Sequence, residues 1–138
     1  MKDTEFENIL DDFNFLENWE DKYRYIIDLG KGLEIYPEEL KCEKYRVIGC
    51  ASQVWFYPEI TNNDGKKIFS FKGDSDAMIV RGLIKIVSSI YNYKEINDAI
   101  LIDPYKKLEL LNLKNHISSQ RSNGLNSMIS KIKIFLNP

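Results

Sequence analysis

Two runs of aromatic and β-branched residues on either side of a tight turn constrain the fold more than any other feature. The runs are 52–57 and 67–71, and Asn62-Asn63-Asp64-Gly65 lies between them. Asn and Gly tolerate the positive φ of hairpin turns, and strands favour aromatic and β-branched side chains. The sequence therefore predicts an antiparallel hairpin, with Tyr45-Arg46-Val47 as a candidate third strand. Because alternation is imperfect, we expect helices to cover one face and water to reach part of the other.

Apolar residues repeat at helical spacing on both sides of this hairpin. The expected helices are Thr4 to about Phe13, about 19–32, about Asp76 to Tyr91, a short helix around 96–101, Pro104 to Leu111, and about Asn123 to Leu136, with a single turn at 37–40. The helix from Asp76, capped by Asp74 or Ser75, has the widest apolar face and should be the central core helix. Asn18 and Asp103 are expected to cap two of the others.

The size and composition of the chain indicate one folded domain. Its 138 residues are 43% hydrophobic and 12% aromatic, which is enough for one core. No low-complexity linker or internal repeat divides residues 1–138. The prediction is a single α+β domain in which helices pack on a small antiparallel sheet.

Charge and hydropathy exclude several classes of protein. Residues 1–40 carry a net charge of −8 and residues 41–138 a net charge of +6. The four arginines, at 24, 46, 81 and 121, are scattered, so we expect no nucleic-acid binding. No apolar run approaches the roughly 20 residues of a membrane-spanning helix, and the N-terminus does not resemble a secretory signal. A cytoplasmic protein is the expectation.

Two cysteines and one histidine limit the chemistry that the chain can perform. Cys42, Cys50 and His116 are too few for an ordinary structural zinc site, so we expect no metal. Cys50 is flanked by Gly49, Ala51 and Ser52, whose small side chains would leave its sulfur at a slim loop tip. The alternative is that Cys50 is an ordinary buried thiol. Cys42, in a charged stretch, is expected to be an incidental surface thiol.

Four ordered blocks of the sequence resemble the SufE/CsdE sulfur-acceptor proteins, and the resemblance covers nearly the whole chain. The blocks are Asn18-Trp19-Glu20-Asp21-Lys22-Tyr23 with Ile26-Ile27-Asp28-Leu29-Gly30, Val47-Ile48-Gly49-Cys50-Ala51-Ser52-Gln53-Val54-Trp55, Gly73-Asp74-Ser75-Asp76-Ala77 with Ile79-Val80-Arg81-Gly82-Leu83-Ile84, and Arg121-Ser122-Asn123-Gly124-Leu125. The chain departs from the family pattern in the hairpin turn and over 92–116. The resemblance implies a SufE/IscU-like α+β fold.

The same resemblance implies a function. Cys50 would accept persulfide sulfur from a SufS/CsdA-type cysteine desulfurase, whose cofactor is pyridoxal phosphate, and would pass it to a SufBCD-type scaffold for iron–sulfur clusters. The protein would also stimulate the desulfurase, and would bind no cofactor itself. Asp76 is expected to hold the cysteine loop, and Arg121 to reach toward the loop or the partner. The family suggests a monomer or weak homodimer.

Two other functions remain open at this stage. Cys50 and His116 could form the pair of a Cys–His hydrolase, which requires hydrogen-bond reach between them. An iron–sulfur scaffold is the second alternative, although such a site usually recruits three or four Cys or His ligands.

Overall fold

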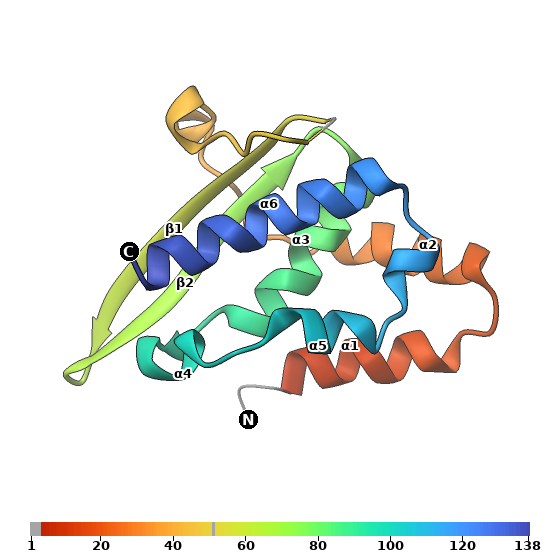
Figure 1. The fold of residues 1–138 in the computed structure, drawn as a ribbon, viewed down its shortest axis with the longest axis horizontal. Coiled ribbons are helices and arrows are strands. Elements are labelled where there is room, and N and C mark those ends of the chain that lie inside the picture. Colours follow the sequence, from red (N-terminus) through yellow and green to blue (C-terminus); the bar gives the residue numbers. More distant parts are fainter. Residues whose placement is uncertain (1–3, 51) are drawn as a thin grey trace.

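A long β-hairpin organises the computed structural model, which describes residues 4–50 and 52–138 (Figure 1). Strand β1 (Val54–Asn63) pairs antiparallel with β2 (Lys66–Ser75) in one continuous register. Asp64 and Gly65 form the turn with φ of 55° and 79°, both in the left-handed region that two-residue hairpin turns use. The predicted hairpin is confirmed, and its strands extend beyond the aromatic runs.

The third strand is not the predicted one. Strand β3 (Lys94–Glu95) follows the central helix and pairs antiparallel with β2 at Ile68 and Phe69. Arg46, in the segment predicted as a strand, makes only an isolated bridge with Trp55. The prediction for 45–47 is wrong because Tyr45 ends a 3₁₀ turn (Glu43–Tyr45) and the chain leaves the sheet soon afterwards at Gly49.

The α-helices lie on one side of the hairpin (Figure 1). They are α1 (Thr4–Phe15), α2 (Trp19–Gly30), α3 (Met78–Tyr91), α4 (Ile96–Ile100), α5 (Pro104–Glu109) and α6 (Ser119–Leu136), with further 3₁₀ turns at Glu38–Leu40 and Leu113–Asn115. Asn18 and Asp103 cap α2 and α5 as predicted, through side chains that accept backbone N–H bonds. Among the described residues, none of these helices is both long enough and apolar enough to cross a bilayer.

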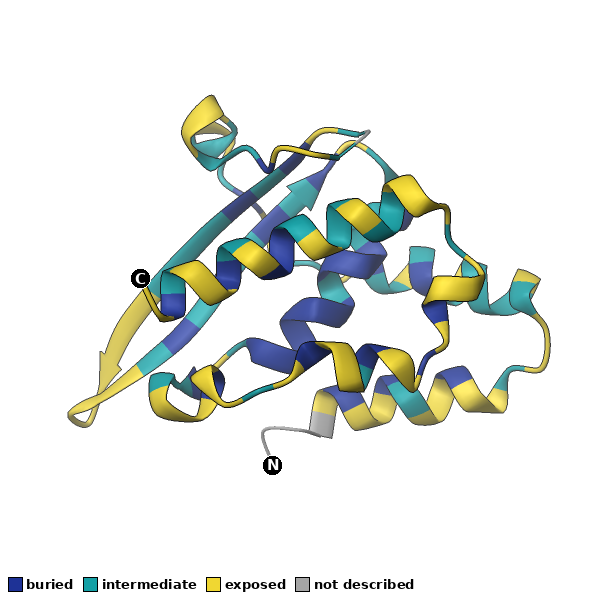
Figure 2. Ribbon diagram, in the orientation of Figure 1, coloured by how far each residue is buried: buried dark blue, intermediate teal, exposed yellow. Residues whose placement is uncertain are grey.

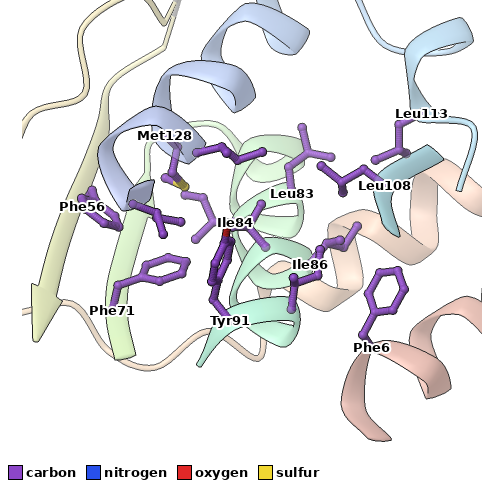
Figure 3. Close-up of a cluster of buried hydrophobic side chains, with 14 of the residues drawn as sticks. Phe6, Phe56, Phe71, Leu83, Ile84, Ile86, Tyr91, Leu108, Leu113 and Met128 are labelled. Atoms are coloured by element: carbon purple, nitrogen blue, oxygen red, sulfur yellow. The ribbon is translucent and has the colours of Figure 1, made fainter. Parts of the chain in front are cut away.

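Helix α3 lies at the centre of the core, as its wide apolar face predicts (Figures 2 and 3). Helices α3 and α6 both pack on the hairpin. The strand residues beneath them alternate, so that Phe56, Phe69 and Phe71 are buried while Trp55 and Tyr57 are only half-buried. Because side chains alternate across a strand, one face of the hairpin is covered and the other is partly exposed. The α+β fold is confirmed.

Two helices begin elsewhere than predicted. Strand β2 continues to Ser75, and α3 begins only at Met78 after Ala77, whose side chain makes no capping bond. Asp74 and Ser75 therefore belong to the strand. Helix α6 begins at Ser119, four residues early, because the Ser118 hydroxyl accepts the Arg121 N–H at 3.2 Å and caps it. Gly124, at the predicted start, lies inside the helix.

Two glycines permit α2 and α3 to cross at very short range. A Cβ atom on Gly82 would lie 1.9 Å from the Ile26 carbonyl oxygen, and one on Gly30 would lie 2.7 Å from the Gly82 nitrogen. No side chain fits at either place. The crossing anchors α3, whose first turn faces the segment that carries Cys50.

Candidate functional site

The candidate site is a loop of residues 48–53, here called the Cys50 loop, which precedes β1. The Val47 N–H donates to the Val54 carbonyl at 2.9 Å and closes the base of the loop. Gly49 has a φ of +98°, which side chains other than glycine rarely adopt. Ile48 is 72% exposed, while Val47 at the base is buried. Ala51, which belongs to the predicted motif, lies outside the described residues.

The Cys50 sulfur lies directly against helix α6. A Cβ atom on Gly124 would be 2.9 Å from Cys50 Sγ, so only glycine leaves room for the sulfur there. On the same helix, Ser127 Oγ would be 3.0 Å from a Cβ on Gly49. The loop therefore rests on α6 through two glycines, one on each side of the contact.

A cavity of about 230 Å³ opens beside Cys50, between the hairpin, α3 and α6. Its lining residues are Cys50, Ser52, Val54, Ala77, Val80, Leu83, Ile84, Ser118, Gln120, Arg121, Gly124, Leu125 and Met128. The aliphatic members form most of this wall, and Ser52, Ser118, Gln120 and Arg121 supply its polar groups. We call it the cysteine cavity. It brings together three of the predicted site residues, Cys50, Ser52 and Arg121.

The resting position of Cys50 favours the protonated form of its thiol. Burial raises the pKa of the Cys50 thiol above its ordinary value, and the charge of Arg46 partly opposes this rise. Since the thiolate is the reactive form of cysteine, the sulfur is a weaker nucleophile in this position than on an exposed loop. Both cysteines are free thiols, and Cys42 is exposed.

Asp76 holds the far end of the Cys50 loop. Its Oδ1 accepts the Gln53 N–H at 3.1 Å, and its own N–H donates to the Gln53 carbonyl at 3.3 Å. The carboxylate thus bonds a backbone amide of the loop, which is the kind of contact that the prediction for Asp76 requires. Because Asp76 is exposed, water can compete for these bonds.

An ion cluster around Asp74 is the part of the site that sequence reasoning missed. Asp74 Oδ2 lies 3.2 Å from Lys41 Nζ, and Asp74 Oδ1 lies 3.1 Å from Arg81 Nε without hydrogen-bonding orientation. Lys41 also lies over the ring of Trp55, 5.4 Å from its centroid. These contacts fasten the 37–46 segment to the hairpin behind the Cys50 loop. Two acids in Gly73-Asp74-Ser75-Asp76 were the available signal, but the sequence did not indicate which cations they meet.

Arg121 and His116 lie in different surroundings. Arg121 is one of the residues that line the cysteine cavity, and among the described residues its guanidinium group has no hydrogen-bond or ion-pair partner. The His116 ring is stacked on Trp19 with centroids 3.8 Å apart, and His116 is absent from the cavity lining. The structure thus brings Arg121, but not His116, to the cavity beside Cys50.

Metal ligands are not gathered at this site. Over residues 4–50 and 52–138, no group of three or more His, Cys, Asp or Glu side chains is arranged to hold a metal ion. The chemistry available at Cys50 is therefore that of a single thiol beside a cationic, largely aliphatic cavity.

Comparisons with known proteins show the family to which the chain is similar. The family model described as "SufE: Fe-S metabolism associated domain" matches residues 7–135. An uncharacterised SufE-like protein of Rhizobium etli is 45% identical over 127 residues, covering 92% of this chain and 86% of that protein. A similar protein of Rhizobium meliloti is 45% identical over 130 residues, covering 94% and 93%.

A solved structure supports the fold independently. The solution structure of a hypothetical protein from Thermus thermophilus superposes with a TM-score of 0.71 at 15% identity, covering 95% of this chain and 92% of that one. At this identity the likeness concerns the fold alone. The family model and the two relatives carry the assignment: the chain belongs to the SufE family of proteins associated with iron–sulfur metabolism.

Proposed function

We propose that this protein carries sulfur on Cys50, from the persulfide of a SufS/CsdA-type cysteine desulfurase to a SufBCD-type scaffold, in the cytoplasm. Membership of the SufE family supports a sulfur-transfer role in iron–sulfur metabolism and a cysteine desulfurase as partner in general. The observation that carries the residue assignment is the half-buried thiol of Cys50, presented on a short loop beside a cavity. The protein acts as a monomer or weak homodimer docked on its partner.

The transfer is an exchange between sulfur atoms. The Cys50 thiolate attacks the outer sulfur of the desulfurase persulfide, a new S–S bond forms, and the S–S bond of the donor breaks. The donor cysteine leaves as a thiolate, and Cys50 becomes Cys50–S–SH. A proton released from the Cys50 thiol balances the charge, so the reaction needs no oxidant and no cofactor on this chain.

The resting geometry supports a loop that moves between two positions. In the observed position burial raises the pKa of the Cys50 thiol. A smaller fraction of thiolate slows the oxidation of Cys50 and its reaction with other electrophiles. To reach a partner, the sulfur must leave Gly124, and the bonds from Asp76 to Gln53 must open or shift. Asp76 thus acts as a positioning residue, and Arg121 stabilises the thiolate when the loop moves. Stimulation of the desulfurase follows from removal of its persulfide.

Mass spectrometry of the protein after incubation with desulfurase and L-cysteine tests the carrier role. The wild-type protein should gain the mass of one sulfur atom, located on Cys50 by peptide mapping, and treatment with dithiothreitol should remove it. The Cys42→Ser variant is the matched control and should gain the same mass. An adduct of equal yield on Cys50→Ser would contradict the proposal.

Desulfurase turnover is the second measurement. Addition of wild-type protein or Cys42→Ser should raise the rate of alanine formation from L-cysteine, whereas Cys50→Ser should not. If Cys50→Ser stimulated the enzyme as strongly as the wild type, sulfur removal could not be the cause of the stimulation.

A further inference from the structure

We propose that the cysteine cavity binds a small aliphatic thiol that carries a carboxylate, and that Cys50–S–SH can pass its outer sulfur to this molecule as well as to a protein. The inference rests on the proposed function for its sulfur donor. Its binding component rests on the cavity alone, so the two components can be tested separately.

The cavity beside Cys50 has room for a small bound molecule. The space of about 230 Å³ adjoins the sulfur, whereas pockets for drug-sized molecules begin at about 300 Å³. The occupant must therefore be small. Most of the wall is aliphatic, from Val54, Val80, Leu83 and Met128 among others, so a short hydrocarbon chain fits it better than a strongly polar molecule.

The charge of the cavity favours an anion. Arg121 is the single charged residue among the described lining residues, and no described residue neutralises it. Ser52, Ser118 and Gln120 also line the cavity, and their side chains can donate hydrogen bonds. A guanidinium group with neutral donors beside it is suited to a carboxylate, which accepts bonds from two N–H groups at once.

The starts of two helices add to the same electrostatic preference. Ala77, which precedes α3, lines the cavity, and so do Ser118 and Gln120 at the start of α6. In Figure 1 both helices begin near the end of the hairpin that continues into the Cys50 loop. The N-terminal end of a helix carries a partial positive charge, and the side chain of Ala77 offers no acceptor to α3. A carboxylate in this cavity would therefore face Arg121 and two favourable helix ends.

The sulfur transfer balances without any further reactant. The thiolate of the small molecule attacks the outer sulfur of Cys50–S–SH and forms a new S–S bond, while the bond between the two persulfide sulfurs breaks. Cys50 leaves as a thiolate, and the small molecule becomes a hydropersulfide that keeps the hydrogen of the transferred S–H group. The carboxylate, held by Arg121, positions the attacking thiolate beside Cys50.

The binding component is tested on the sulfur-free protein by the rate of Cys50 alkylation. A Cys42→Ser background confines labelling to Cys50, and the rate with anionic iodoacetate is divided by the rate with neutral iodoacetamide. Arg121→Gln should lower this ratio about threefold, the size of effect expected for a partly exposed ion pair. Arg24→Gln, on the exposed face of α2, is the matched control and should leave the ratio unchanged. Equal ratios in the wild type and Arg121→Gln would overturn the anion preference.

Protection by small molecules without a thiol tests the aliphatic part of the binding. Butyrate at millimolar concentration should slow the labelling of Cys50 by iodoacetamide, while acetate and butylammonium at the same ionic strength should slow it less. If the three ions act equally, the cavity does not select a chain with a carboxylate, and the proposal fails.

The transfer component is measured after Cys50 has been charged with sulfur and separated from desulfurase and L-cysteine. At equal thiolate concentration, 3-mercaptopropionate should discharge Cys50–S–SH at least about threefold faster than cysteamine, an advantage lost in Arg121→Gln and kept in Arg24→Gln. Equal rates for the two thiols would overturn the transfer. If Cys50 cannot be charged at all, both the proposed function and the transfer are wrong, and the alkylation ratio still decides whether the cavity prefers anions.

Discussion

Gly124 faces Cys50 at the point where α6 meets the Cys50 loop, and replacing it with alanine should displace the sulfur. The added Cβ would lie 2.9 Å from Cys50 Sγ, too close for contact. Alanine also favours a helix interior over glycine by about 1 kcal/mol, so the fold should lose little stability. We expect Gly124→Ala to raise the rate of Cys50 alkylation by iodoacetamide several-fold while the urea midpoint changes little.

A neighbouring residue provides the control for this experiment. Asn123 is exposed on the same turn of α6, so Asn123→Ala changes helix propensity without touching the sulfur. Its alkylation rate should equal that of the wild type. An unchanged rate in Gly124→Ala would show that the loop already leaves α6 freely.

The charge of Arg46 should lower the pH at which Cys50 becomes reactive. Burial raises the pKa of the Cys50 thiol, and the charge of Arg46 lowers it. Removal of that charge in Arg46→Gln should raise the pKa further, so the midpoint of the rate–pH profile for alkylation should move to higher pH. The profile of Arg24→Gln should coincide with that of the wild type. In urea-unfolded protein the Cys50 thiol is no longer buried. The pH midpoint of the alkylation profile should therefore be lower in all three unfolded proteins than in the folded ones.

Individual residues differed in how well the sequence could predict their surroundings. Gly49 was expected to be a small neighbour of Cys50, and the structure adds a φ of +98°, which favours glycine at this position. The bonds between Asp76 and Gln53 agree with the expected type of contact. The pairing of Asp74 with Lys41 joins residues 33 positions apart, and no local pattern indicates such a pair.

The close crossing of α2 and α3 should make Gly82 one of the residues least tolerant of substitution. A Cβ on Gly82 would lie 1.9 Å from the Ile26 carbonyl oxygen, and backbone atoms cannot move aside as a side chain does. Such overpacking costs about 3 kcal/mol or more, well above the gain in helix propensity. Urea denaturation of Gly82→Ala should therefore show a clearly lower free energy of unfolding.

Gly32 offers the matched comparison for Gly82. A Cβ on Gly32 would lie 3.5 Å from the Leu29 carbonyl oxygen, an ordinary contact. Gly32→Ala should be as stable as the wild type or slightly more stable. Equal stability of the two alanine variants would mean that the helices separate easily at their crossing.

Elements with a local signal could be predicted, and those defined by distant pairing could not. The hairpin turn and the caps at Asn18 and Asp103 depend on residues within a few positions of one another, and all three occur. Strand β3 is two residues long and exists because it meets β2 at Ile68 and Phe69. The start of α6 was predicted at about Asn123, four residues late, because the apolar stripe begins only at Leu125 whereas the Ser118 cap starts the helix at Ser119.

At the scale of the whole molecule, the reactive loop lies outside the main core. Cys50 is half-buried at the surface of the core, whereas Phe69 is fully buried among Phe71, Tyr91 and Phe135. Cys50→Ser should therefore change the free energy of unfolding by less than about 1 kcal/mol. Phe69→Ala should lower it by about 3–5 kcal/mol. Thermal and urea unfolding of the two variants provide the measurement, and a large loss in Cys50→Ser would show that the loop is part of the core.

The hairpin tip at Asp64 and Gly65 lies at the other end of β1 from the Cys50 loop. Ten residues of strand separate them, about 30 Å of extended chain, and the tip is exposed (Figure 2). A fluorescent dye or short affinity peptide inserted there would be remote from the sulfur chemistry. The molecule thus offers a natural attachment point from which its encounters with other proteins can be followed in real time.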